Sequence, residues 1–183
     1  IPAAIGGVGA TAGQLAKIHG CTVIGIAGSD EKCRYAIKRL GYDACVNRNS
    51  ENVAERLDQL CPNGIDIFFD LVGGALLQTA SERLAIGARV ILCGLMSEYN
   101  NKARAAGPPP GLWIKARAIV YGLVVYDFET RRNEFIDNCK PYINDGRLQC
   151  KEDISEGLES APEAFCRLMR GENVGKSVVR VSS

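Results

Sequence analysis

The stretch Ala4-Ile5-Gly6-Gly7-Val8-Gly9 runs directly into a segment of helical period, residues 10–18. A turn of this kind directs backbone N–H groups toward a phosphate at the N-terminus of the helix, and its small residues allow close approach. The pattern Gly-x-Gly-x-x-Gly is typical of dinucleotide-binding turns, and Ala4, Gly6 and Gly9 occupy its three small positions. The turn by itself is a weak signal, because an ordinary glycine-rich turn can also precede a helix.

Segments of β-type composition alternate with helical segments along most of the chain. The pattern predicts helices at residues 9–19, 30–40, 51–60, 75–84 and 133–144, and strands at 22–27, 43–46, 65–70, 88–93 and 118–125. This alternation is typical of an α/β fold with a doubly wound parallel sheet of the Rossmann type. Residues 97–111 contain Asn-Asn and Gly-Pro-Pro-Pro-Gly, and we expect a long surface loop there.

The pattern changes after Gly146. A strand at 148–154, a helix at 161–170 and a strand at 177–181 are predicted for the tail. We therefore expect a dinucleotide-binding domain at residues 1–145 and a piece of another unit at 146–183. Few residues precede the glycine turn, too few for a full strand, so we also expect the first strand to be incomplete and an N-terminal part to be missing.

Composition excludes several classes of partner. The formal net charge is +1, with 22 basic and 21 acidic residues interleaved, so we expect neither a nucleic acid nor a membrane partner. The chain shows no signal peptide or long apolar segment, and we expect a cytoplasmic protein. The eight cysteines are scattered without a C-x-x-C pair and His19 is the only histidine, so no metal site is expected.

The end of the predicted strand at residues 22–27, which is the second strand when the incomplete first one is counted, indicates which dinucleotide binds. NAD-binding folds carry an acidic residue there, about 20 residues past the glycines, whereas this chain has Ala27-Gly28-Ser29. Lys32 follows one helical turn later, and Arg48 follows the third strand. Together they would attract a 2′-phosphate, which favours NADPH; alternatively, both are ordinary solvated surface charges.

Glycines also follow two later strands. Asp70-Leu71-Val72-Gly73-Gly74 ends the strand at 65–70, and Cys93-Gly94 ends the next. Parallel sheets bind ligands beyond the carboxyl ends of their strands, so these positions suggest a cofactor lying along that rim. A tight turn and a packed small residue would explain them equally well.

Taken together, these motifs resemble a known family. They are Ala3 to Gly9 with Gln14, residues 27–32, residues 69–74, Cys93 to Asn100, the Gly-Pro-Pro-Pro loop and residues 171–176. The chain is similar to the zinc-independent branch of the medium-chain dehydrogenases/reductases, in the group of prostaglandin reductase (leukotriene B4 12-hydroxydehydrogenase) and curcumin reductase. The resemblance implies an NADP(H)-dependent enone reductase that adds hydride to the β-carbon of a small-molecule α,β-unsaturated ketone or aldehyde.

The resemblance also implies an architecture. A β-rich, chaperonin-10-like catalytic domain would precede the glycine turn, and residues 146–183 would be its C-terminal piece. The family further implies a homodimer, formed by joining sheet edges near residues 118–125.

The site residues implied by the resemblance fall into two sets. Tyr99 and Lys115 are the catalytic candidates. The cofactor-binding candidates are Gly6, Gly7, Val8, Gly9, Gly28, Ser29, Lys32, Arg48, Leu71, Cys93, Gly94, Leu95, Ser97, Tyr99, Leu123, Val124, Val125 and Asn173.

The chain departs from the family at three positions. Asn47-Arg48 stands where relatives have Asn-Tyr, Leu71 where they often have asparagine, and Lys115 where some have a tyrosine that assists the oxyanion. The departures leave room for a non-catalytic NADPH-binding sensor or structural relative. A doubly wound methyltransferase is a further alternative, but that class usually carries an acidic residue where Ala27-Gly28-Ser29 lies.

Overall fold

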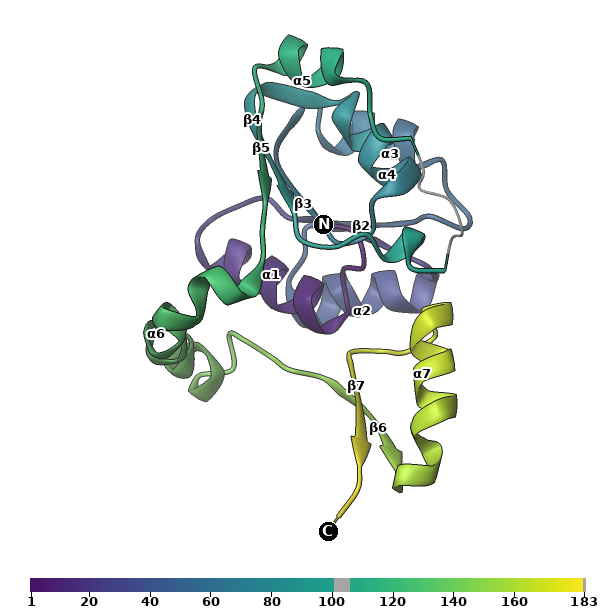
Figure 1. Cartoon of the computed structure of the whole chain (residues 1–183). Coiled ribbons are helices and arrows are strands. Elements are labelled where there is room, and N and C mark those ends of the chain that lie inside the picture. Colours follow the sequence, from purple (N-terminus) through teal and green to yellow (C-terminus); the bar gives the residue numbers. More distant parts are fainter. Residues whose placement is uncertain (101–105, 183) are drawn as a thin grey trace.

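The computed structural model describes residues 1–100 and 106–182, and its strands pair in parallel throughout (Figure 1). Strand β1 (Ile24–Ala27) pairs with β2 (Ala44–Asn47), and β3 (Ile65–Asp70) pairs with β4 (Leu84–Leu92), which pairs in turn with β5 (Ile119–Gly122). The tail forms a separate pair, β6 (Glu152–Glu156) with β7 (Lys176–Arg180). The predicted parallel α/β organisation is confirmed.

Helices connect the strands. They are α1 (Gly7–Ile18), α2 (Asp30–Leu40), α3 (Val53–Leu60), α4 (Gly74–Ser81), α5 (Pro110–Ala116), α6 (Arg132–Asn144) and α7 (Ala161–Arg170). Short 3-10 helices η1 (Met96–Glu98), η2 (Val125–Arg131) and η3 (Leu158–Ser160) complete the set. Helix α2 is capped at both ends: the Ser29 hydroxyl accepts from the Lys32 N–H at 3.3 Å, and Gly41 ends the helix at φ +73°.

Several predicted boundaries were wrong. Helix α5 occupies part of the expected loop, because Pro110 is accommodated in a first helical turn, where its missing N–H has no intrahelical acceptor to lose. The strand predicted at 118–125 ends at Gly122, and Val125 begins η2. Strand β4 begins at Leu84, inside the segment predicted as helix, and β6 begins at Glu152 rather than at residue 148. Residues 101–105 of the predicted loop lie outside the described residues.

Strands β1 and β3 do not pair with each other in the described part of the chain. On the side of β1 away from β2, Pro2 forms an isolated parallel bridge with Ile26, and the Ile26 N–H donates to the Ile1 carbonyl at 3.0 Å. A cavity of about 510 Å³ lies between β1 and β3, lined mainly by apolar side chains. Residues 1–4 bond to the edge of β1 on this side, through Ile1 and Ala4.

Two apolar clusters form the core. The first joins α1, α2 and the strands beside them, and consists of Ala4, Ile5, Val23, Ala36, Leu40 and Tyr42. The second lies under α4 and consists of Phe68, Leu77, Ala80 and Val90. Burial of these side chains supplies the main driving force for packing the helices on the strands.

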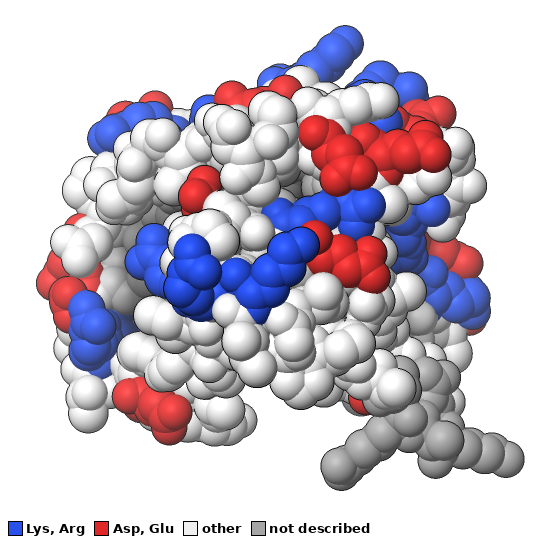
Figure 2. All heavy atoms as spheres, turned by 90° about the horizontal axis from the view of Figure 1, so that it is seen from above, with Lys and Arg blue, Asp and Glu red and all other residues white. Residues whose placement is uncertain are grey.

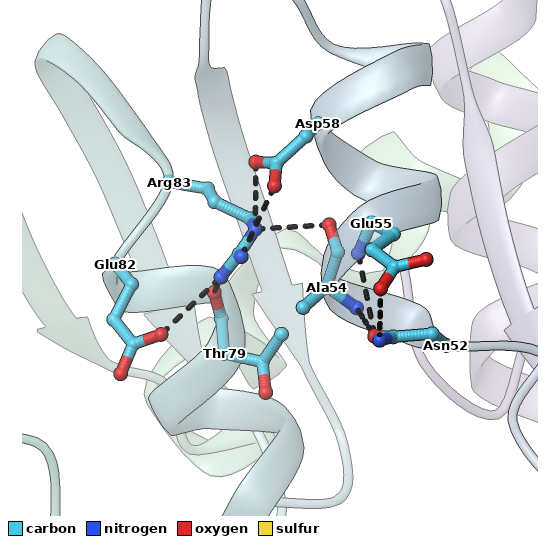
Figure 3. Close-up of polar contacts among 7 residues, drawn as sticks. All are labelled: Asn52, Ala54, Glu55, Asp58, Thr79, Glu82 and Arg83. Carbon is cyan, nitrogen blue, oxygen red and sulfur yellow. Dashed lines mark hydrogen bonds and ion pairs between the residues drawn. The ribbon is translucent and has the colours of Figure 1, made fainter.

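Arg83, just after α4, ties α4 to α3 (Figure 3). Its guanidinium donates to the Ala54 carbonyl at 3.1 Å and to the Thr79 carbonyl at 2.9 Å. Ion pairs to Asp58 at 2.9 Å and to Glu82 at 3.3 Å flank these bonds. A single side chain therefore satisfies carbonyls on both helices.

Side chains of both signs interleave on the face that Figure 2 shows from above, in keeping with the near-neutral charge of the chain. Within residues 1–100 and 106–182, no helix combines the length and the apolar character needed to cross a membrane.

The tail is attached to α1 by the buried amide of Gln14. Its Nε2 donates to the carbonyls of Ala10, at 3.0 Å, and Gln149, at 2.9 Å, while its Oε1 accepts from the Gln149 N–H at 2.8 Å. Gln14 is 2% exposed, so these bonds are largely shielded from water. The side chain thus pairs with the tail backbone as a neighbouring strand would.

Replacing Gln14 with leucine should lower the free energy of unfolding by about 2 kcal/mol, because the shielded N–H and carbonyl of Gln149 lose their partners. Urea denaturation measures this change. Gln59→Leu, at an exposed position on α3, is the matched control and should shift stability by no more than about 0.5 kcal/mol. Equal effects of the two substitutions would contradict the assigned role of Gln14.

Candidate functional site

A cavity of about 560 Å³ opens beside the N-terminus of α1, between the glycine turn and the tail segment that follows α7. Its walls come from the turn, from the residues after β1, β2 and β3, from the segment around η1, and from the tail. The lining residues are Ala3, Ala4, Ile5, Gly6, Gly7, Val8, Gly9, Ala27, Gly28, Lys32, Arg48, Leu71, Val72, Met96, Ser97, Asn100, Leu168, Met169, Arg170, Gly171, Asn173, Gly175, Lys176 and Ser177.

The glycine turn forms the floor of this cavity. Helix α1 begins at Gly7, and no side chain caps its N-terminus. The first N–H groups of a helix have no intrahelical acceptor, and the helix dipole adds positive potential there. A Cβ on Gly9 would overlap the backbone carbonyl oxygen of Ala3. Glycine is therefore required for the helix to begin this close to Ala3.

Two cations lie at the ends of β1 and β2. Lys32 in α2 and Arg48 after β2 both line the cavity, as does Gly28, where a Cβ would lie 3.7 Å from a guanidinium nitrogen of Arg48. Partial burial, and next the positive charge of Arg48, lower the pKa of Lys32. The Lys32 ammonium donates to the carbonyl of Gly171 in the tail. Since the two cations disfavour each other, an anion bound between them would relieve this repulsion.

The turn after β3 is fixed by a buried carboxylate. Asp70 is fully buried, and its Oδ1 accepts from the Val72 N–H at 2.9 Å and the Gly73 N–H at 3.1 Å. Burial raises the pKa of Asp70, while these N–H donors act in the opposite direction. The Val72 carbonyl in turn accepts from the Ser97 hydroxyl at 2.7 Å. Asp70 thus holds the wall to which Leu71, Val72 and Ser97 belong.

The tail supplies the opposite wall. The side chain of Asn173 donates to the Gly175 carbonyl at 2.8 Å, and Asp153 accepts from the Val174 N–H at 3.0 Å. Lys176 lies next to the turn, because a Cβ on Gly7 would be 3.0 Å from its Cδ. Sequence reasoning did not assign Lys176 to the site, although it ends the quoted motif at residues 171–176.

The structure brings ten of the predicted cofactor-binding residues to this cavity: Gly6, Gly7, Val8, Gly9, Gly28, Lys32, Arg48, Leu71, Ser97 and Asn173. It also adds positions that the sequence did not single out, among them Met96, Asn100 and Arg170. Arg170 forms ion pairs with Glu163 and Glu172.

Other predicted residues lie outside the lining. Ser29 caps α2, and the N–H groups of Cys93 and Gly94 donate to the Asp70 carbonyl. These residues therefore stabilise the backbone of elements that carry lining residues. Leu95 precedes η1, and Leu123, Val124 and Val125 follow β5. Their contacts with a cofactor stay predictions.

The two catalytic candidates are not among the described residues that line the cavity. Tyr99 follows η1 and is 63% exposed. Lys115 lies in the last turn of α5, before the amino end of β5, whereas the cavity lies beyond the carboxyl ends of the strands. Their catalytic roles stay predictions.

Among the described residues, no group of three or more His, Cys, Asp or Glu side chains is placed to hold a metal ion.

The donor set fits a nicotinamide dinucleotide with a 2′-phosphate. A helix N-terminus that no side chain caps suits a pyrophosphate, and two adjacent cations suit a phosphate monoester. The glycines of the turn leave the space that side chains would otherwise fill. Together these features cover both ends of the adenosine half of such a molecule.

Comparison with known proteins identifies the family. The family model described as zinc-binding dehydrogenase matches residues 7–140. The chain is 39% identical to "NADPH-dependent curcumin reductase" of Escherichia coli (strain K12), over 100% of the chain and 54% of that protein. It is 37% identical to "Prostaglandin reductase 1" of Bos taurus, over 98% of the chain and 55% of that protein.

A solved structure agrees with this assignment. The crystal structure of CurA in complex with NADPH from Vibrio vulnificus matches with a TM-score of 0.93 at 38% identity, over 100% of this chain and 56% of that one. The chain thus spans about half the length of the relatives it matches. The resemblance read from the motifs is confirmed: the chain belongs to the zinc-binding dehydrogenase family, in the zinc-independent group of medium-chain dehydrogenases/reductases that includes curcumin reductase and prostaglandin reductase 1.

Proposed function

We propose that this chain is the dinucleotide-binding part of an NADPH-dependent reductase that saturates the carbon–carbon double bond of α,β-unsaturated ketones or aldehydes. The observation that carries the proposal is the meeting of the α1 N-terminus, Lys32 and Arg48 in one cavity. The names of the relatives, curcumin reductase and prostaglandin reductase, support a reductase that uses NADPH.

The adenosine half of NADPH would occupy the cavity between the turn and α2. The backbone N–H groups of Gly7, Val8 and Gly9 bind the pyrophosphate, since it carries the negative charge that a helix N-terminus favours. Lys32 and Arg48 bind the 2′-phosphate, for which NADH has no counterpart. Lys32 exchanges its bond with the Gly171 carbonyl for a bond with the phosphate.

The nicotinamide half would lie along the wall formed by the residues after β3 and around η1. Leu71 and Ser97 line this wall, and Asn173 approaches from the tail. When bound, NADPH would supply hydride for the substrate β-carbon, and negative charge would then develop on the carbonyl oxygen. Of the two catalytic candidates, Tyr99 is better placed to donate to that oxygen, because Ser97 and Asn100 on either side of it line the cavity.

Removing the two cations should change cofactor preference. Lys32→Ala and Arg48→Ala should each raise the Kd for NADPH more than about tenfold, since each removes a charge-assisted bond of roughly 1.5–3 kcal/mol. The Kd for NADH should change less than about threefold, and fluorescence titration measures both. Lys38→Ala, which removes an exposed lysine from the same helix, should change neither. An equal loss for the two cofactors would exclude binding of the 2′-phosphate by these residues.

The reaction itself is tested by turnover. The purified protein should oxidise NADPH in the presence of a simple enone, and NADPH deuterated at the transferred position should leave deuterium on the β-carbon of the product, as detected by mass spectrometry. Tight NADPH binding without turnover of enones or enals would instead support the non-catalytic sensor or structural relative.

We also propose a homodimer joined through β5. This strand pairs with β4 on one side only within the described residues, and Ile119 and Tyr121 are 63% and 44% exposed. An uncovered apolar strand edge favours pairing with a second copy.

Sedimentation velocity should find a dimer for the unmodified protein and a monomer for Tyr121→Lys, because like charges would face each other across the two-fold axis. Ile86→Lys places the same charge at an exposed position on β4 and should leave the dimer intact. A monomeric unmodified protein would rule out this interface.

A further inference from the structure

A buried tyrosine lies directly behind the glycine turn, on the side away from the cavity. Tyr42 is 2% exposed, and its hydroxyl contacts the carbonyl of Gly9 at 2.7 Å and the carbonyl of Ala4 at 3.1 Å. Ala4 follows Pro2, which forms the bridge beside β1, and Gly9 lies in the first turn of α1. One phenol therefore contacts the backbone on both sides of residues 5–8.

The surrounding residues make room for this ring. A Cβ on Gly13 would overlap the Tyr42 hydroxyl, and a Cβ on Gly25 would lie 2.7 Å from the ring carbon Cδ2. These two glycines come from α1 and β1, so both elements that flank the turn leave space for the same side chain. Gly13 and Gly25 have no positive φ that would otherwise require glycine.

The backbone of Tyr42 is itself fixed. Gly41 ends α2 in the left-handed conformation, and the Tyr42 N–H donates to the Ala36 carbonyl at 3.1 Å. The next residue, Asp43, donates its N–H to the Val23 carbonyl at 3.0 Å. The backbone that carries the phenol is thus held by α2 and by Val23, the residue before β1, rather than by the turn that the phenol contacts.

We propose that Tyr42 is a positioning residue for the dinucleotide: its hydroxyl holds the carbonyls of Ala4 and Gly9 so that the N–H groups of Gly7, Val8 and Gly9 face the pyrophosphate. The inference rests on the proposed function, because it assigns Tyr42 to the same cofactor site. The phenol touches no part of the cofactor and acts only through the turn. Burial raises the pKa of Tyr42, so the hydroxyl keeps its proton at neutral pH.

Tyr42→Phe tests the proposal, since it keeps the packed ring and removes only the hydroxyl. The Kd values for NADPH and NADH should both rise about three- to tenfold, the range that corresponds to one lost hydrogen bond. The Kd for 2′-AMP should stay within about twofold, because this probe carries the adenosine and the 2′-phosphate but no pyrophosphate. Tyr35→Phe, a ring packed against the same cluster, is the matched control and should leave all three values unchanged.

Amide hydrogen exchange provides a readout that needs no ligand. In Tyr42→Phe, the hydrogen-bonded amides of Gly6 and Ala10, which donate to the Ala3 and Gly6 carbonyls, should exchange at least threefold faster, while those of α2 keep their rates. Unchanged affinity and unchanged exchange would overturn the proposal, and so would an equal loss of affinity for all three ligands or equally faster exchange in α2. If the unmodified protein bound no dinucleotide, the proposed function would fail, whereas the exchange comparison would still decide whether Tyr42 orders the turn.

Discussion

The close approach of α1 to the residues before it is the constraint on which the site depends. The Ala4 N–H donates to the Ile26 carbonyl at 3.2 Å, which anchors the start of the turn to β1. The Gly6 N–H then donates to the Ala3 carbonyl at 3.0 Å, and Gly9 passes so close to Ala3 that no larger residue fits. These contacts fix where α1 begins, and therefore where its unpaired N–H groups point.

The remaining walls are assembled from distant parts of the chain by the parallel topology. Because parallel strands place their carboxyl ends on one side, the residues after β1, β2 and β3 come together although the sequence separates them widely. Asp70 stabilises one wall from within, and the tail closes the other through Gln14 and the contact between Lys32 and Gly171. Lys32 of α2, Arg48 after β2 and Lys176 of β7 line the cavity, and none of the described residues that line it is Asp or Glu, an arrangement that favours an anion.

Much of the fold could be predicted from the sequence, and the exceptions have physical reasons. The prediction of helix α2 was correct at both ends, because Ser29 is a strong helix-capping signal and Gly41 a strong signal for the end of a helix. Helix α5 was missed because Pro110 reads as a breaker, although it is well suited to a first turn. Strand β4 was predicted too short, because its first residue, Leu84, joins the sheet only by pairing with Ile65 of β3. The register then shifts before Arg89 pairs with Ile67, and Gly87 has φ +77°, so local preference does not indicate this extension.

The sequence by itself determined the class of fold, the glycine turn and the pair of cations, because each depends on residue type at short spacing. Only the tertiary structure decided that Lys176 and Arg170 line the cavity and that Lys115 lies away from it. It also decided that Tyr42 contacts both sides of the turn. These relations depend on how α2, α5 and the tail pack against the strands, and such long-range packing leaves no local periodic signal in a single sequence.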